Sequence, residues 1–261
     1  PRPDLPARRR MTGQQTETVS LSDARPPAGM RLYAIGDIHG CVDELAEMHR
    51  LIAADIERDK PSDWRVIHVG DYIVRGPDSR GVISHLIHAR ARDERFIMLG
   101  GNHDIGLLEF LDQPTPNGLF VRFGGIQTAA SYGVQLDVDS PAGIERGHAA
   151  LTKALARGHL DFLTSLRFSV SFGDFFFCHA GIKPGVPLER QKQDQLIWIR
   201  DEFLDYPHLH TKVVVHGHTP AAEPELRPNR VNVDTRAYES GVLSALAIFH
   251  EKKQLLGVEA Y

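Results

Sequence analysis

Residues 66–81 have the sequence VIHVGDYIVRGPDSRG, and this stretch decides how the rest of the chain is interpreted. It begins with β-branched residues, Val66 and Ile67 among them, which are typical of a buried strand. Gly70 then ends the strand, so that Asp71 lies in the loop at its carboxyl end. Open α/β sheets bind their ligands at such positions. A single aspartate there is more often a turn or cap residue, so the interpretation depends on whether the pattern recurs.

The pattern recurs at four other stretches of the chain. They are LYAIGDIHG at 32–40, FIMLGGNHD at 96–104, FFFCHAG at 175–181 and VVVHGHTP at 213–220. Each is a predicted strand that runs into Asp, Asn or His. Carboxylate, amide and imidazole ligands together suit manganese, iron or zinc better than magnesium or calcium. We therefore predict a metal centre assembled from five loops.

The ordered series GDIHG, GDYIVRGPDS, GGNHD, CHAG and HGHTP resembles the calcineurin-like metallophosphoesterases, in particular their bacterial phosphoprotein phosphatase branch. The resemblance extends from Met30 to Tyr238 and so covers most of the chain. It implies a four-layer α/β fold, in which two mixed β-sheets pack as a central sandwich flanked by helices. One position departs from the family pattern GDxVDRG, because Val74 stands where the second aspartate belongs.

The resemblance also implies a centre of two divalent metal ions, with manganese expected and iron or zinc as alternatives. The implied ligands are Asp37 and His39 for the first ion, Asp71 as the bridge, and Asn102, His179 and His218 for the second. His216 competes with His218 for one role, and the alignment of the motif favours His218. Many members of the wider superfamily have GHxH here, but Pro220 occupies the last position in this chain.

The remaining catalytic roles are carried over in the same way. Arg75 matches the family arginine, and Arg200 is the second candidate for binding the transferred phosphoryl group together with Asn102. A planar guanidinium can bind two phosphate oxygens at once. Two further arginines, Arg122 and Arg236, are weaker candidates. The family mechanism is direct attack by a metal-bound water or hydroxide, with His103 as the general acid.

Val74 has a chemical consequence for His103. In the family, the aspartate at this position accepts a hydrogen bond from the histidine, orients its ring and raises its pKa. Valine cannot accept a hydrogen bond, and the adjacent Asp104 is poorly placed to do so. We therefore expect His103 to be less often protonated, which slows the hydrolysis of alkyl phosphates. Aryl phosphates and phosphoanhydrides have better leaving groups and should be affected less.

Three functions are consistent with these residues. The longer set of matching motifs favours a protein phosphatase that hydrolyses phosphoserine or phosphothreonine, with phosphotyrosine as a further candidate substrate. The second hypothesis is a hydrolase of dinucleoside polyphosphates like the symmetrical diadenosine tetraphosphatases, which resemble this chain in having a small apolar residue at position 74. The third is a phosphatase-fold protein that binds its ligand and turns over poorly. The expected partner is a phosphorylated protein or a small phosphate ester.

Composition places the chain among ordinary globular proteins and excludes some partners. Its 261 residues are 42% hydrophobic and 25% charged, with a formal net charge of -4. This charge gives no reason to expect nucleic acid or anionic membranes as partners. No apolar run approaches the roughly 18 residues that span a bilayer. We expect a cytoplasmic protein whose two cysteines are reduced, and the oligomeric state stays open.

The chain divides into a leader and one catalytic domain. Residues 1–29 are rich in proline and polar residues and predict a disordered or loosely docked leader, and residues 30–261 form the domain. Within it, residues 112–160 are expected to form a cap or rim over the site. Helical spacing predicts helices at 41–58, 79–92, 105–111, 125–131 and 142–157. Strands are predicted as a hairpin at 168–177 and at 213–216, 230–234, 242–250 and 254–261.

Overall fold

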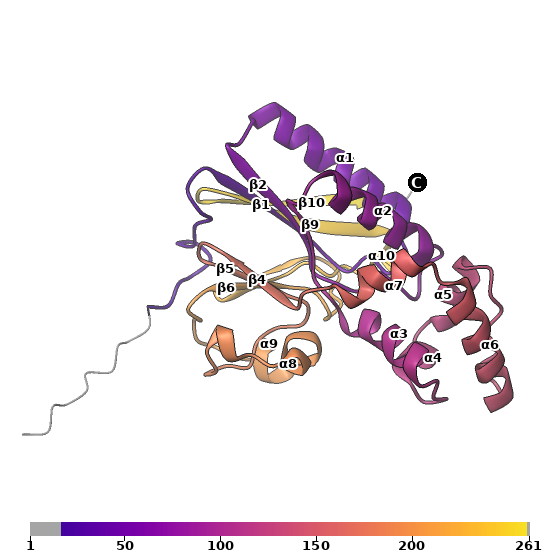
Figure 1. Ribbon diagram of the computed structural model, residues 1–261. Coiled ribbons are helices and arrows are strands. Elements are labelled where there is room, and N and C mark those ends of the chain that lie inside the picture. The colour runs from indigo at the N-terminus through magenta and orange to yellow at the C-terminus, as the bar shows by residue number, and fades with distance from the viewer. Residues whose placement is uncertain (1–16, 260–261) are drawn as a thin grey trace, which may run out of the picture.

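Two five-stranded β-sheets lie face to face in the computed structural model, which describes residues 17–259 (Figure 1). The first sheet has the strand order β10–β9–β1–β2–β3. Its strands are β1 (Met30–Ile35), β2 (Asp63–His68), β3 (Phe96–Met98), β9 (Val242–Phe249) and β10 (Lys252–Glu259). Strands β1 to β3 are parallel, whereas β9 and β10 are antiparallel. The sheet is therefore mixed, as expected.

The second sheet is also mixed and has the order β4–β5–β6–β8–β7. Its strands are β4 (Ser169–Phe172), β5 (Phe175–Cys178), β6 (Val213–His216), β7 (Glu225–Leu226) and β8 (Arg230–Asn232). Strands β4 and β5 form the predicted hairpin, whose turn contains Gly173 at a positive φ of 56°. Strands β5, β6 and β8 are parallel, so that their carboxyl ends meet at one edge.

Helices cover the outer faces of both sheets and complete four layers (Figure 1). Helices α1 (Val42–Asp59) and α2 (Ser79–Arg92) cover the first sheet, and α8 (Gln193–Trp198) and α9 (Asp201–Leu204) cover the second. A short helix, α10 (Ala237–Ser240), precedes β9. Buried apolar clusters fill the three spaces between the layers. Among residues 17–259, no helix is both long enough and apolar enough to cross a membrane.

The segment expected to form a cap is helical. It contains the end of α3 (Asn102–Asp112), then α4 (Leu119–Arg122), α5 (Gly125–Ser131), α6 (Pro141–Ala154) and α7 (Arg157–Thr164). The expectation of one helix at 142–157 was wrong at its end. Leu155 and Ala156 are extended, so the chain turns and α7 buries Phe162 and Leu163 as a separate helix.

Helix α3 begins at Asn102, three residues before the predicted start. The carboxylate of Asp104 accepts a hydrogen bond from the backbone N–H of Gly101 at 2.9 Å, which satisfies a donor at the start of the helix. The early start matters because it places the polar residues Asn102, His103 and Asp104 on the first helical turn.

The expectation of a disordered or loosely docked leader does not hold for residues 17–29, which pack against the domain. Residues 1–16 lie outside the described part of the chain. Ala24 is fully buried in the core between the sheets, and Val19 and Leu21 pack against the same core. The backbone N–H groups of Val19 and Leu21 donate to carbonyl oxygens of the domain at 3.0 and 2.7 Å. Apolar contacts and backbone hydrogen bonds together dock this polar segment onto the domain.

Candidate metal centre

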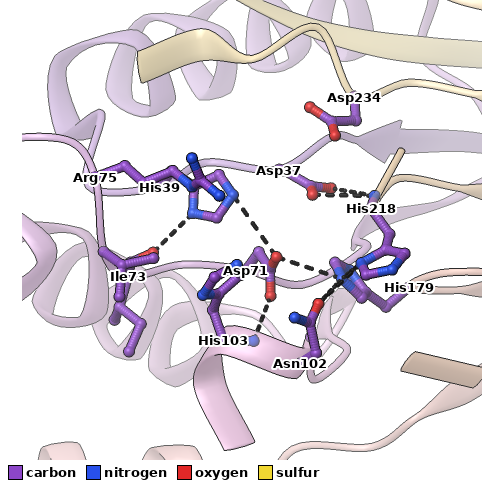
Figure 2. Close-up of polar contacts among 12 residues, drawn as sticks. Asp37, His39, Asp71, Ile73, Arg75, Asn102, His103, His179, His218 and Asp234 are labelled. Atoms are coloured by element: carbon purple, nitrogen blue, oxygen red, sulfur yellow. Dashed lines mark hydrogen bonds and ion pairs between the residues drawn. The ribbon is translucent and has the colours of Figure 1, made fainter. Parts of the chain in front are cut away.

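The five predicted strand ends meet in one buried site (Figure 2). Strands β1 and β2 of the first sheet lead into the loops that carry Asp37, His39 and Asp71, and β3 leads into α3. Strands β5 and β6 of the second sheet lead to His179 and His218. Strands β1, β2 and β3 are parallel to one another, and so are β5 and β6, so within each sheet their carboxyl ends lie at one edge. The site is thus built at the junction of the two sheets.

One oxygen of Asp71 lies between two histidine nitrogens. Asp71 Oδ2 is 3.6 Å from His39 Nε2 and 3.4 Å from His179 Nε2. The other oxygen, Oδ1, accepts the backbone N–H of His103 at 3.0 Å. The side chain of Asp71 is therefore fixed in a position that two different groups of ligands share.

Backbone carbonyls determine which nitrogen these histidines present. His39 Nδ1 lies 2.8 Å from the carbonyl oxygen of Ile73, and His179 Nδ1 lies 3.1 Å from that of Val69. A carbonyl only accepts hydrogen bonds, so each Nδ1 carries a proton. In the neutral ring, each Nε2 then directs a lone pair toward the Asp71 carboxylate, which is an arrangement typical of metal ligands. A divalent cation between them would satisfy both groups.

A second set of acceptors surrounds His179. Asn102 Oδ1 lies 2.8 Å from His179 Nε2 and 2.9 Å from His218 Nδ1, and the two histidine nitrogens are 3.2 Å apart. Neighbouring ligands of an octahedral ion, each about 2.1 Å from it, lie about 3.0 Å apart. Asp71, His179 and His218 also form a group whose ligand atoms all lie within 4.8 Å of one another. These residues fit a divalent ion.

The other group with ligand-like spacing consists of His39, Asp71 and His103. In this group, His103 takes the position of the ligand to the first ion that the sequence analysis assigned to Asp37. Both oxygens of Asp37 instead approach the backbone N–H of His218, at 3.0 and 3.3 Å. Asp37 still lines the same cavity. The structure therefore brings together all six expected ligands, with His103 as a close neighbour of the first set.

Asp234 is a further buried carboxylate that the sequence analysis did not identify. It follows β8, lines the cavity and lies beside Asp37 in Figure 2. Burial raises the pKa of Asp37, and the charges of Asp234 and Asp71 raise it further. Burial likewise raises the pKa of Asp234. Several carboxylates with so little solvent favour the binding of cations. The signal was present in the sequence, since VNVD at 231–234 is another strand that ends in aspartate.

His103 lacks the hydrogen-bond partner that its family role requires. Its Nδ1 is buried and has no hydrogen-bond partner. Burial lowers the pKa of His103 to about 4, although the Asp71 charge opposes this effect. Val74 offers no acceptor, and the carboxylate of Asp104 accepts backbone N–H groups of Asp71, Tyr72 and Gly101 instead. The orphaned nitrogen is the expected consequence of valine at position 74.

The loop of Val74 has an unusual backbone conformation. Asp71, Val74 and Arg75 have positive φ angles of 52°, 66° and 67°. Such angles are uncommon for residues other than glycine and are most strained for β-branched residues. The N–H of Val74 donates to Thr128 Oγ1 at 3.0 Å and lies 3.2 Å from Ser79 Oγ. Helix α5, which carries Thr128, thus holds the strained loop in place.

Of the four candidate arginines, Arg75 and Arg200 line the cavity. Arg75 Nη1 donates to the hydroxyl of Tyr238 at 3.0 Å, and its buried Nε has no partner. Arg200 Nη2 donates to the carbonyl oxygen of His218 at 3.2 Å. Arg122 and Arg236 are not among the residues that line it. His216 also lies away from the cavity, where its ring packs against Phe203.

The cavity itself measures about 140 Å³ and is open on one side. Its rim contains three aromatic residues that the sequence analysis did not assign to the site, Phe123, Trp198 and Tyr238. No local pattern distinguished them, because each comes from a different segment and reaches the site only through the fold. Phe123 follows α4, so part of the segment 112–160 does border the site.

Several known proteins with similar sequences are named as nucleotide hydrolases. An asymmetrical bis(5'-nucleosyl)-tetraphosphatase of Oceanobacillus iheyensis is 24% identical over 241 residues, which cover 86% of this chain and 90% of that protein. A symmetrical bis(5'-nucleosyl)-tetraphosphatase of Nitrosospira multiformis is 29% identical over 161 residues, 62% of this chain and 47% of that protein. The similarity to the asymmetrical enzyme thus extends over nearly its whole length.

Solved structures share the fold. A putative diadenosine tetraphosphatase has a TM-score of 0.63 at 21% identity, covering 90% of this chain and 96% of that one. A protein serine/threonine phosphatase from Saccharomyces cerevisiae has a TM-score of 0.54 at 12% identity, covering 92% and 86%. The model of the calcineurin-like phosphoesterase family matches residues 30–245. Together with the two mixed sheets and the buried ligand groups, this match shows that the chain belongs to the calcineurin-like phosphoesterase family.

Proposed function

We propose that this phosphoesterase hydrolyses dinucleoside polyphosphates, cleaving a phosphoanhydride bond within the polyphosphate chain. The catalytic centre is the buried site around Asp71, and the reaction consumes one water molecule. This hypothesis was the second one drawn from the sequence. It now has more support than the protein phosphatase, because the related proteins described above are named as bis(5'-nucleosyl)-tetraphosphatases over most of the chain.

The orphaned Nδ1 of His103 is the observation that carries the proposal. An alkoxide is a poor leaving group, so the hydrolysis of phosphoserine depends on a general acid. The lowered pKa of His103, about 4, leaves this residue mostly neutral at pH 7. A nucleotide that leaves from a phosphoanhydride is a weak base and needs little protonation. The site is thus better suited to the phosphoanhydride.

The residues of the site have the following roles in the proposal. Arg75 and Arg200 bind the phosphates on either side of the bond that breaks. A guanidinium there offsets the charge that develops in the transition state. Tyr238 orients Arg75 through its hydroxyl, which accepts the 3.0 Å hydrogen bond.

The metal site also belongs to the proposal. Asp37, His39, Asp71, Asn102, His179 and His218 hold two divalent ions, with manganese expected because imidazole and carboxylate ligands are mixed. When bound, such ions polarise a phosphoryl oxygen and lower the pKa of water. Within the protein, Asp71 and the backbone carbonyls of Ile73 and Val69 orient the histidine ligands. A cytoplasmic location is part of the same proposal, since both cysteines are buried free thiols.

A protein phosphatase has weaker support. The serine/threonine phosphatase from Saccharomyces cerevisiae shares 12% identity with this chain and is evidence for the fold alone. The motif around Arg200 that favoured this hypothesis is compatible with either substrate, because both carry phosphate. The third hypothesis, a protein that binds its ligand and turns over poorly, requires that the site also fail to hydrolyse substrates with good leaving groups.

The proposal is tested by product analysis. Purified protein with excess Mn²⁺ is incubated with diadenosine tetraphosphate, and the nucleotides are separated by anion-exchange chromatography. ATP with AMP, or ADP alone, supports the proposal and identifies which bond is cleaved. The matched control is the Asp71→Asn variant, which removes the charge of the bridging carboxylate. Intact dinucleotide with protein shown to contain its metal ions would contradict the proposal.

A further inference from the structure

Two exposed aromatic rings border the metal centre. Five large hydrophobic residues are highly exposed among residues 17–259, and the aromatic ones are Phe123, at 38%, and Trp198, at 46%. Both line the cavity, whereas the other three, Ile126, Leu226 and Leu255, do not. Single exposed hydrophobic residues are common on proteins. Two aromatic rings at the mouth of one catalytic cavity are a more specific arrangement.

Each ring adjoins a different ligand group. The ring of Phe123 packs edge-on against that of His103, with centroids 6.1 Å apart. The ring of Trp198 packs edge-on against that of His218, with centroids 6.0 Å apart. His103 belongs to the group of His39 and Asp71, and His218 to the group of Asp71 and His179. The two rings therefore adjoin the two halves of the centre.

Phe123 is held in its position by the backbone that follows it. Gly124 has a φ of 108°, and a Cβ atom there would lie 2.5 Å from the backbone nitrogen of Arg75. The close contact fixes the segment of Phe123 against the loop that carries Arg75. The Arg75 guanidinium carbon lies 5.9 Å from the centre of the Phe123 ring. A phosphate bound by Arg75 would thus have an aromatic ring nearby.

Trp198 is anchored by the helix that ends with it. It is the last residue of α8, whose Leu196 and Ile197 are buried beneath the second sheet. The carbonyl oxygen of Leu196 accepts the N–H of Ala180 at 2.7 Å, which fixes α8 to the loop of His179. Arg200, which lines the same cavity, follows two residues later. Each ring therefore has an arginine close to it in the chain or in space.

We propose that Phe123 and Trp198 are specificity-determining residues that stack on the two purine bases of the substrate. The inference rests on the function proposed above. A dinucleoside polyphosphate has a base at each end of a phosphate chain, which matches a phosphate site with an aromatic ring adjoining each half. Stacking of a base on an aromatic side chain is sequence-tolerant and contributes substantially to the binding of nucleotides.

The first test compares ligands with and without bases. The KM for diadenosine tetraphosphate is measured together with the apparent Ki of inorganic tripolyphosphate as a competitor. In Trp198→Ala and Phe123→Ala, the ratio of KM to Ki is expected to rise roughly tenfold each, near the lower end of the range for one stacked base. Trp198→Phe keeps a ring and should restore most of the selectivity. Ile126→Ala and Leu226→Ala are matched controls, since these residues are exposed outside the cavity.

The second test does not depend on turnover. The chain has two tryptophans, so Trp64→Phe leaves Trp198 as the only one. Titration of this variant in excess Mn²⁺ with a non-hydrolysable, methylene-bridged analogue of diadenosine tetraphosphate should quench its fluorescence, because a purine stacks on the indole. Tripolyphosphate at the same concentration should quench much less.

The outcomes separate this inference from the proposed function. If the wild type leaves the dinucleotide intact, the proposed function fails and this inference fails with it. If the wild type cleaves the dinucleotide but neither ring variant changes the ratio of KM to Ki, the function stands and the stacking role is wrong. Equal quenching by tripolyphosphate would also overturn the stacking role. A raised ratio with restoration by Trp198→Phe supports it.

Discussion

The Asp104 carboxylate accepts a hydrogen bond from the backbone N–H of Asp71 at 2.9 Å. This contact joins α3 to the loop of the bridging ligand and holds Asp71 at its positive φ of 52°. Asp104 is fully buried, and burial together with the Asp71 charge raises its pKa to about 7. Asp104, the residue next to the predicted general acid His103, thus orients the metal ligand Asp71 and does not serve as an acceptor for His103.

Removing this carboxylate should weaken both the fold and the metal site. Asp104→Ala leaves the buried N–H groups of Asp71, Tyr72 and Gly101 without their acceptor. Since each unsatisfied buried donor costs about 1–3 kcal/mol, we expect the free energy of unfolding to fall by about 3 kcal/mol or more. Urea denaturation in EDTA measures this loss. Asp112→Ala, an exposed residue at the end of the same helix, is the control, and equal stability of the two variants would refute the role of Asp104.

Asp71→Asn should reduce the number of bound metal ions. The amide keeps the size of the side chain but loses the charge that lies 3.6 Å from His39 Nε2 and 3.4 Å from His179 Nε2. An uncharged side chain cannot neutralise two ions at once. Metal analysis after gel filtration in Mn²⁺ should show two ions per chain in the wild type and fewer in the variant. Retention of two tightly bound ions would exclude a bridging role for Asp71.

Restoring the family aspartate should broaden the range of substrates. Val74→Asp supplies an acceptor for His103 Nδ1, so the rate on a phosphoserine peptide should rise by up to about 10²-fold. The gain on diadenosine tetraphosphate should be much smaller, because its leaving group needs less protonation. Val74→Asn is the matched control, because asparagine also tolerates positive φ but lacks the charge that would raise the pKa of His103. Equal gains on both substrates, or no gain on the peptide, would contradict the role given to Val74.

Three histidines outside the site predict how stability depends on pH. His49 Nε2 lies 2.8 Å from His68 Nε2, and His49 Nδ1 lies 2.9 Å from His85 Nε2. Burial and the neighbouring imidazoles lower the pKa of His49 to about 2, and burial lowers that of His68 to about 4. Both therefore stay neutral in the folded state when the unfolded chain, with a pKa of about 6.5, takes up protons. Stability should be complete above pH 7 and fall as the pH drops from about 6.5 toward 4.

The size of this fall can be measured by urea denaturation in EDTA at several pH values. Each of His49 and His68 contributes up to about 1.4 kcal/mol per pH unit below the unfolded pKa. His49→Gln should lose part of this slope relative to the wild type, whereas the exposed His208→Gln should keep it. If the wild type and His49→Gln have the same slope, the buried histidine chain does not titrate as described.

Much of the fold was predictable from the sequence because its signals are local. The strand ends carrying Asp71, His179 and His218 lie directly after β-branched or aromatic runs, and both α1 and α2 have helical spacing. Parallel strands then force these ends to the same edge. The valine at position 74 correctly indicated a missing partner for His103. That inference depended only on the hydrogen bond that the family aspartate makes with this histidine.

The features that were not predicted depend on contacts between distant segments. Asp234 approaches Asp37 across 197 positions of the sequence, and Phe123 lines the cavity next to Gly124, whose backbone packs on that of Arg75. The segment 17–29 has a polar composition, yet the burial of Ala24 docks it. Composition and spacing cannot show such contacts, because they describe one segment at a time.

The most direct measurement is a competition between the two substrate classes. Diadenosine tetraphosphate and a phosphoserine peptide are supplied together to the wild type in excess Mn²⁺, and all products are resolved by chromatography. The neutral His103 and the nucleotide-hydrolase relatives predict release of mononucleotides while the peptide keeps its phosphate. Release of inorganic phosphate from the peptide with intact dinucleotide would contradict the proposed function.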